Sequence, residues 1–411
     1  MTSITFCIFP FISMVTRNSG ELGICCRSTA VGHITQNTLT ETWNNDTMKR
    51  VRLELLDGKK PIECAGCWRH EDIGIESKRT RNLDLSKPES MYSKFNGVEK
   101  SMLSDGTMPT YPQILEIRVN NLCNLKCRMC SPLDSSSWND WHIVKDIVNK
   151  TTPKTVQLID KLKLEERPLL DRYGESFYID LLKIIPNLKQ VDFSGGEPLT
   201  NPAHYRIVDM LMPYAKNIIL KYDTNLLNLT FKKVDLFKVW DNFKGINLNV
   251  SVDGIDKIYD HIRTNGNFCD IKSNLDKVSS YHKLNRLVIA SAISIYNIHD
   301  ITNITRLAAS YNAIHHMCKV SFPEFLSCQI LPADEKKKII STLTAFLHEI
   351  PNLYCNEVAK NYITTQYKDL MVFLQIEKNE SLMDNFVNYE TKLNTSRNTL
   401  SLNHIPGVKN V

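Results

Sequence analysis

Three cysteines stand close together in the segment NLCNLKCRMC (121–130), at Cys123, Cys127 and Cys130. A structural zinc site or a closed iron–sulfur site takes four protein ligands, and this segment holds no fourth ligand-type side chain. Three thiolates on a four-iron cluster leave one iron open, where a small molecule with an amine and a carboxylate can chelate. These residues alone leave two other interpretations open: a zinc site completed by a distant residue, and three unligated thiols.

The cysteine segment must be positioned by the elements around it, and it follows directly on an apolar run, ILEIRV. From residue 113 onward, β-type runs alternate with amphipathic stretches, and strands are expected at 114–119, 190–195, 217–224, 246–253, 286–294 and 313–320. Six β/α units imply a parallel sheet covered by helices, with ligands at the carboxyl ends of the strands. Because a complete barrel has eight units, we predict an α/β fold with a partial (β/α)6 barrel.

A glycine pair ends the second expected strand, in FSGGEPL (193–199). Glycines let the backbone approach a ligand closely, and the carboxylate and backbone groups that follow can receive an ammonium group. Together with the C-x3-C-x2-C spacing, this segment resembles the radical S-adenosylmethionine (radical SAM) superfamily, over roughly residues 113–332. The resemblance implies that the amino group of the methionine moiety is bound at Ser194, Gly195, Gly196, Glu197 and Pro198.

The same resemblance implies cofactor contacts at later strand ends and beside the third cysteine, namely at Met129, Thr224, Asn225, Ser251, Asp253, Arg263 and Asn297. Ser251 and Asp253 sit where the family contacts the ribose and the carboxylate, and Arg263 matches its carboxylate-pairing arginine. Taken alone, Arg263 could equally be a dipole partner at a helix C-terminus. Met129 stands where many members carry an aromatic residue over the adenine.

The resemblance also implies a reaction. A [4Fe-4S] cluster donates one electron to bound S-adenosylmethionine, which splits into methionine and a 5′-deoxyadenosyl radical that abstracts hydrogen from the substrate. Such an enzyme needs a reductant such as flavodoxin or ferredoxin. The sequence names no catalytic base.

A second group of cysteines lies near the N-terminus, at Cys7, Cys25 or Cys26, Cys64 and Cys67. Their arrangement resembles the twitch or SPASM-like auxiliary-cluster module of many radical SAM enzymes, although here it precedes the barrel. Four thiolates are enough to close an iron–sulfur site, and a zinc knuckle has the same ligand count. An auxiliary cluster could take an electron from the substrate radical or ligate the substrate directly.

Members with this module most often act on peptides or proteins, so we expect hydrogen abstraction from a peptide or protein side chain. One alternative is oxidation or rearrangement of a small molecule, such as a sugar or nucleotide. Another is a non-catalytic, metal-binding regulatory protein, which would have no use for an open iron.

Composition limits the partners and the location. The formal charge of +5 on 411 residues does not favour nucleic-acid binding, and the sequence contains no run of about twenty apolar residues for a membrane span. Clustered metal thiolates imply a reducing compartment, so a cytoplasmic location is expected. The other cysteines, expected as buried free thiols, are Cys269, Cys318, Cys328 and Cys355.

Changes in cysteine content and hydrophobic pattern along the chain predict its domain organisation. We expect an auxiliary-cluster domain over residues 1–85 and a linker over 86–112. The partial barrel follows over 113–332, and a C-terminal helical extension with a tail spans 333–411.

Overall fold

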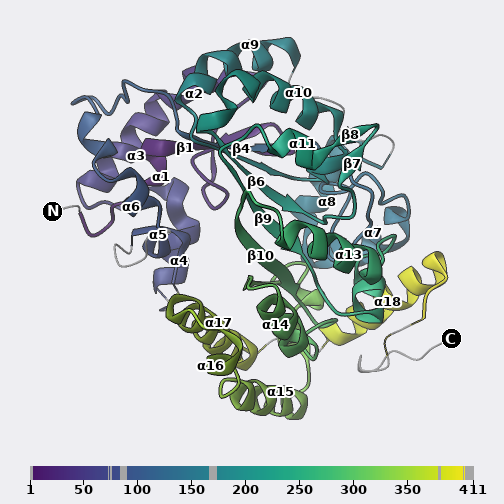
Figure 1. Cartoon of the computed structure of the whole chain (residues 1–411). Helices are drawn as coiled ribbons and strands as arrows, with labels where there is room; N and C mark the ends of the chain where they lie inside the picture. Colours follow the sequence, from purple (N-terminus) through teal and green to yellow (C-terminus); the bar gives the residue numbers. More distant parts are fainter. Residues whose placement is uncertain are drawn as a thin grey trace. The chain divides into compact units, whose positions relative to one another are not determined.

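The computed structural model describes residues 3–72, 74, 76–83, 90–165, 174–377, 381–400 and 402. The chain divides into two compact units, which Figure 1 allows the reader to follow by colour. The first unit comprises residues 1–120, 170–222 and 237–246, and the second comprises 121–169, 223–236 and 247–411. The predicted tail falls largely on residues 403–411, which lie outside the described part of the chain.

Strands form the centre of the first unit, in the order β3-β2-β1-β4-β5-β6. Their bounds are β1 Ser13–Thr16, β2 Glu21–Gly23, β3 Ala30–His33, β4 Ile114–Arg118, β5 Gln190–Ser194 and β6 Ile219–Thr224. Strands β1, β4, β5 and β6 pair in parallel, whereas β2 pairs antiparallel with β1 and β3. Every residue of β5 is buried, as expected of a parallel strand covered on both faces.

Short helices surround these strands. They are α1 Phe9–Ile12, α2 Leu39–Trp43, α3 Asp46–Leu56, α4 Ala65–Asp72, α5 Lys78–Leu83, α6 Met91–Phe95, α9 Gly174–Ile184, α10 Pro202–Leu211 and α11 Leu236–Trp240. Single 3₁₀ turns are η1 Ile62–Cys64, η2 Val98–Ser101, η3 Ile185–Asn187, η4 Pro198–Thr200 and η5 Met212–Asn217. Side-chain caps fix where two of the α-helices start. Thr38 and Glu41 form a capping box on α2, and Asn45 caps α3.

A fully buried arginine ties together distant parts of the first unit. Arg52 of α3 donates hydrogen bonds to the carbonyl oxygens of Pro10 (2.8 Å), Trp43 (2.6 Å) and Gly106 (3.0 Å). It also donates to Asn44 Oδ1 at 2.9 Å. Burial lowers the pKa of Arg52 to about 9, so the side chain remains a cation at neutral pH.

The second unit contains neighbouring strands and a long helical C-terminal part. Its strands are β9 Gly245–Ser251, β10 Leu284–Ile293 and β11 Ile314–Lys319, of which β10 and β11 pair in parallel, and a small hairpin of β7 Thr230–Phe231 and β8 Val234–Asp235. Its helices are α7 Trp141–Thr151, α8 Pro153–Lys161, α12 Lys257–Ile262, α13 Phe268–Ser279, α14 Ile301–Ser310, α15 Ala333–Phe346, α16 Ile350–Leu353, α17 Glu357–Gln375 and α18 Leu382–Arg397, with the 3₁₀ turns η6 Glu324–Leu326 and η7 Cys328–Ile330.

One apolar core fills the second unit. It joins α7 and α14 to the C-terminal helices, and α18 packs on α7 while α17 packs on β11. The residues that carry this core on α18 are Leu382, Phe386, Tyr389 and Leu393, spaced three to four apart on one helix face. The C-terminal extension is therefore an integral part of this unit's core.

The α/β class and the six β/α units of the predicted partial barrel are confirmed, with strands β4, β5, β6, β9, β10 and β11 at the expected positions. The helical C-terminal extension is also confirmed. The predicted domain boundaries remain predictions. No helix within the described ranges is both long and apolar enough to span a membrane.

The prediction of buried thiols outside the two cysteine groups holds for one residue and is wrong for three. Cys328 is buried, whereas Cys269, Cys318 and Cys355 are exposed. On β11, the alternation of buried and exposed side chains turns Cys318 outward. Cys269 lies in the first turn of α13, on its solvent-facing side.

Candidate functional site

The three clustered cysteines lie on a loop that follows β4, and the described residues of this loop from 121 onward belong to the second unit. Cys127 is buried, and Cys123 and Cys130 are half-buried. The loop is held through its backbone: Trp138 Nε1 donates to the Cys127 carbonyl at 3.1 Å, and Ser137 Oγ donates to the Cys123 carbonyl at 2.7 Å. These two contacts use carbonyl oxygens and not the thiols, so they fix the backbone of the loop without engaging the sulfur atoms.

Electrostatics favour a thiolate at the middle cysteine. A hydrogen bond from the Cys130 thiol lowers the pKa of Cys127, and the guanidinium groups of Arg263 and Arg397 act in the same direction, against the effect of burial. The same hydrogen bond, with burial, raises the pKa of Cys130 well above its usual value. A metal or cluster that binds here must therefore displace a proton from Cys130.

A buried ion pair lies beside Cys127. Arg263 Nη2 lies 2.7 Å from Asp253 Oδ2, and Arg263 Nη1 lies 3.9 Å from Cys127 Sγ. The Ala292 amide donates to Asp253 Oδ1 at 2.7 Å, which fixes the carboxylate. Arg263 caps the C-terminus of α12, so its position fits both a role in pairing with a carboxylate and a role as partner of the helix dipole. Within the described part of the chain, Arg263 Nε has no hydrogen-bond partner, which leaves a buried donor for an anionic ligand.

Two other predicted cofactor residues touch the cysteine loop or its surroundings. Asn225 Nδ2 donates to Asn124 Oδ1 at 2.8 Å, so the polar position after β6 contacts the loop between the first two cysteines. Met129 Sδ accepts a hydrogen bond from Ser294 Oγ at 3.7 Å. These contacts place Asn225 and Met129 near the predicted cluster site.

Two more predicted residues have structural contacts. The buried Asn297 donates from Nδ2 to the Asp253 and Ala292 carbonyls, both at 2.9 Å, and accepts from the Ser294 amide. Its amide group thus ties the end of β10 to the segment that carries Asp253. The buried Thr224 accepts from the Leu226 amide at 2.9 Å. Ser251, at the end of β9, is half-buried. Cofactor contact by these residues stays a prediction.

The glycine-rich segment 194–198 forms a tight turn in the first unit, between β5 and η4. Gly195 has φ +76° and Gly196 has φ +43°, in the left-handed region that favours glycine. A Cβ on Gly195 would lie 2.7 Å from Asn18 Oδ1 and 3.0 Å from Arg118 Cβ. Glu197 is only 1% exposed, and its Oε1 accepts the Leu199 amide at 3.0 Å. Ser194 and Pro198, at the two ends of the turn, are buried.

The second group of cysteines lines a cavity in the first unit, with an empty volume of about 340 Å³ that is partly open to solvent. Its thiols are Cys7, Cys25, Cys64 and Cys67, with Lys78 and Arg79 also in the lining. Cys26 is exposed and does not line the cavity; its Sγ accepts a hydrogen bond from Lys78 Nζ at 3.1 Å. The structure therefore separates two cysteines that are adjacent in the sequence.

Burial dominates the chemistry of this cavity. It raises the pKa of Cys7, and it raises that of Cys64 to about 12, with further increases from the other cavity cysteines. An iron–sulfur cluster distributes its thiolates over several irons, so its ligands stand around a space and not around one point. Four thiols around a cavity fit the cluster.

The sequence analysis missed Tyr259. Its buried hydroxyl has no hydrogen-bond partner among the described residues, and burial raises the pKa of Tyr259, with Arg263, Cys127 and Asp253 near enough to influence it. The signal was available, because Tyr259 precedes Arg263 by four residues and so shares its side of α12.

Comparison with known proteins adds one domain assignment. Residues 7–68 match the family model of SPASM, an iron–sulfur cluster-binding domain. No curated protein matches the chain.

Solved structures similar to the chain include native anSMEcpe with bound AdoMet and Cp18Cys peptide, at 13% sequence identity and a TM-score of 0.35. They also include SuiB of Streptococcus suis bound to S-adenosylmethionine, at 12% identity and a TM-score of 0.35. The first match covers 58% of this chain and 60% of that chain. The second covers 70% and 58%. The chain thus spans less than two thirds of either solved chain.

The domain match covers all four cavity cysteines and confirms the predicted auxiliary iron–sulfur domain at the N-terminus. Taken together with the C-x3-C-x2-C segment, it shows that the chain resembles radical SAM enzymes that carry a SPASM-type auxiliary domain, as the sequence predicts.

Proposed function

We propose that the chain is a radical SAM enzyme that abstracts hydrogen from a peptide or protein side chain, assisted by an auxiliary iron–sulfur cluster. The observation that carries the proposal is one loop that holds Cys123, Cys127 and Cys130, with the buried cation Arg263 placed 3.9 Å from Cys127 Sγ. Three thiols and a cation are the groups needed to hold a cluster with one open iron and to attract an anionic ligand to it.

In this proposal Cys123, Cys127 and Cys130 hold a [4Fe-4S] cluster. When bound, this cluster supplies the electron that cleaves the C–S bond of S-adenosylmethionine, giving methionine and the 5′-deoxyadenosyl radical. Arg263 offers its Nε–H, which has no partner among the described residues, to the carboxylate of the methionine moiety, and Asp253 holds the guanidinium in place. Residues 194–198 are expected to bind the amino group.

The auxiliary cluster is assigned to Cys7, Cys25, Cys64 and Cys67. Four cysteines around one cavity can fill every iron position, which supports a role in electron transfer over direct ligation of the substrate. Because burial raises the pKa of Cys7 and Cys64, the protons of these two thiols must leave when the cluster binds. Lys78 and Arg79 supply positive charge beside the resulting thiolates.

The peptide or protein substrate is proposed from the auxiliary domain, because radical SAM enzymes with this module most often modify peptides or proteins. The electron for the open cluster comes from a reductant such as flavodoxin or ferredoxin. A peptide substrate should increase the rate of 5′-deoxyadenosine formation. If the peptide is labelled with deuterium, the label should appear on the 5′ carbon of 5′-deoxyadenosine, which mass spectrometry can detect.

The first test is reductive cleavage itself. We expect protein reconstituted without oxygen to release 5′-deoxyadenosine when S-adenosylmethionine and a strong reductant are added. Cys127→Ala should abolish the release, because it removes the buried ligand of the open cluster. Cys269→Ala is the matched control, since Cys269 is an exposed cysteine of the same unit and should be dispensable. No release from a wild-type protein with filled clusters would favour a binding or regulatory role.

A further inference from the structure

We propose that helix α18 positions the cluster loop, residues 121–130. Its side chains bind the backbone on both sides of Cys127 and so determine how firmly the open cluster is held. This inference rests on the cluster proposed above for Cys123, Cys127 and Cys130. Helix α18 begins more than 250 residues after the loop, so it lies far outside the cysteine motif in the sequence.

The first contacts between α18 and the loop are hydrogen bonds to backbone carbonyl groups. Arg397 Nη1 donates to the Lys126 carbonyl at 2.9 Å, and Tyr389 Oη donates to the Arg128 carbonyl at 2.8 Å. These are the carbonyl groups of the two residues that flank Cys127. Arg397 is itself fixed, since its Nε lies 2.7 Å from Asp140 Oδ2. Two side chains of one helix thereby hold the peptide units around the buried cysteine.

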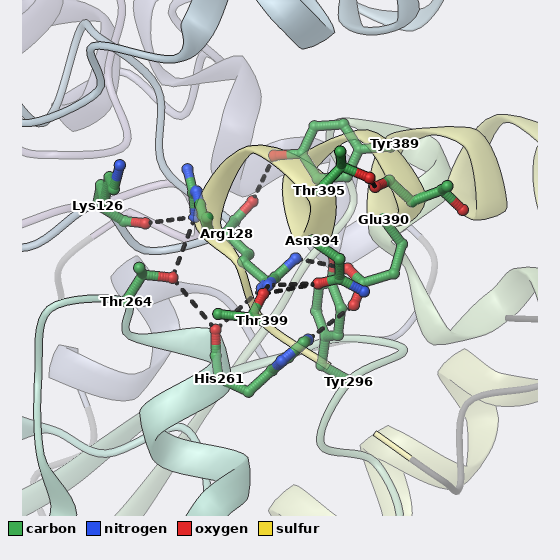
Figure 2. A network of polar contacts seen from close by, with 12 residues as sticks. Lys126, Arg128, His261, Thr264, Tyr296, Tyr389, Glu390, Asn394, Thr395 and Thr399 are labelled. Carbon is green, nitrogen blue, oxygen red and sulfur yellow. Dashed lines mark hydrogen bonds and ion pairs between the residues drawn. The ribbon is translucent and has the colours of Figure 1, made fainter. Parts of the chain in front are cut away.

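The side chain of Arg128 provides a second attachment. This residue stands between Cys127 and Cys130, is 0% exposed, and extends toward α18 (Figure 2). It donates to Glu390 Oε2 at 2.8 Å, Asn394 Oδ1 at 2.7 Å and Thr399 Oγ1 at 2.9 Å. Its Nε donates to the His261 carbonyl at 2.9 Å. The arginine of the cysteine motif is therefore an anchor, because each of its three guanidinium nitrogens donates to another residue.

Glu390 is the charge that makes this anchor possible. Its carboxylate is 0% exposed and also accepts hydrogen bonds from His261 Nε2 and Tyr296 Oη, both at 2.7 Å. Burial alone would raise the pKa of Glu390, but the hydrogen bond from His261 and the charge of Arg128 outweigh it and lower the pKa to about 2. Removing this charge would leave Arg128 buried without a counter-ion, which is strongly unfavourable.

These contacts bear on the cluster because of where they act. Loops bind clusters well when their thiols are already held in place, since no binding free energy is then spent on ordering the loop. The contacts from α18 fix the two residues around Cys127, and the hydrogen bond from Arg397 brings a guanidinium charge to the residue next to it. Loosening α18 should thus change both the retention of the open cluster and its electronic environment.

The test measures how fast the reconstituted full-length protein loses iron from the open cluster to a chelator under anaerobic conditions. Tyr389→Phe removes only the hydroxyl that donates to the Arg128 carbonyl, and we expect iron loss to become about fivefold faster, as for the loss of one hydrogen bond. Glu390→Gln should have a larger effect. Asp384→Asn is the matched control, since Asp384 is an exposed carboxylate on the same helix and should leave the rate unchanged.

Two further readouts separate positioning from simple loss of fold. Circular dichroism should be unchanged in Tyr389→Phe, while the reduction potential and electron paramagnetic resonance signal of the open cluster shift. Unchanged iron loss, potential and resonance signal in both Tyr389→Phe and Glu390→Gln would overturn the inference. A wild-type protein that binds no cluster at Cys123, Cys127 and Cys130 would instead refute the proposed function. Should Glu390→Gln fail to fold, Tyr389→Phe decides.

Discussion

Two adjacent thiols, Cys25 and Cys26, show how much depends on the direction of a single side chain. Cys25 lines the cavity with three other cysteines, while Cys26 is exposed and accepts a hydrogen bond from Lys78. The first side chain is therefore available to a cluster inside the cavity, and the second is directed to a lysine at its edge.

We predict that Cys25→Ala abolishes the auxiliary cluster, whereas Cys26→Ala retains it. Iron analysis of the reconstituted protein should give about eight irons per chain for wild type and Cys26→Ala, and about four for Cys25→Ala. The variants form a matched pair because they remove the same atom from neighbouring positions. Equal iron contents in the two variants would contradict the assignment of Cys25, and bound zinc in the wild type would favour a zinc knuckle.

A second prediction at this scale concerns Gly195. Its positive φ and its contacts with Asn18 and Arg118 both disfavour a side chain. Gly195→Ala should therefore lower the free energy of unfolding by about 2–4 kcal/mol. Gly58 isolates the backbone effect, because it has φ +79° with no atom within 4 Å of an added Cβ, so Gly58→Ala should cost only about 1 kcal/mol. Denaturant unfolding of both variants checks the difference.

Close spacing predicted that Cys123, Cys127 and Cys130 belong together, whereas the resemblance to the auxiliary-cluster module grouped the N-terminal cysteines. Neither could choose between Cys25 and Cys26, since that choice depends on which way each side chain points in the folded first unit. Tyr259 was missed for a related reason: the sequence shows its spacing of four residues from Arg263, but not that its hydroxyl lies buried without a partner among the described residues.

At the scale of elements, the strands and helices were predictable because their apolar periodicity is local. Strands β4, β5, β6, β9, β10 and β11 all lie where the apolar runs predict them. The contacts of α18 were not predictable, because they are polar pairs between residues far apart in the sequence. Arg128 and Glu390, for example, are separated by 262 positions. No local pattern connects such residues.

The buried Arg52 gives a prediction at this scale, since it connects α3 to the ends of α1 and α2 and to Gly106. Arg52→Met should lower the free energy of unfolding by about 3–5 kcal/mol, because several buried carbonyl groups lose their donor. Arg50→Met on the same helix is the control. The side chain of Arg50 is 44% exposed, although its partner Glu63 is buried, so its loss should cost less than the loss of the fully buried Arg52. Equal losses in thermal unfolding would show that burial of Arg52 does not matter.

At the scale of the whole molecule, buried neutral histidines set the response to acid. Burial lowers the pKa of His204 and of His315 to about 3. An unfolded histidine has a pKa near 6.5, so between about pH 6.5 and 3 the unfolded chain binds protons that the folded chain does not. The folded state should therefore lose stability as the pH falls through this range, by about 1.4 kcal/mol per pH unit for each of these histidines.

Urea unfolding at several pH values checks this expectation. His204→Gln should reduce the pH dependence of the free energy of unfolding, because it removes one of the two groups. His142→Gln should leave the pH dependence unchanged, since His142 is exposed on α7. An unaltered slope in His204→Gln would show that this histidine is protonated in the folded state as well.

The attachment of the cysteine loop to α18 also has a consequence for biosynthesis. A ribosome adds about 5–20 residues per second, so Glu390 is made roughly 10 to 50 seconds after Arg128, from which it is separated by 262 positions. During that interval the nascent loop has its three thiols but not the helix that holds it. A cluster delivered to this loop is therefore expected to be held more firmly once translation has passed Arg397 and α18 can form its contacts.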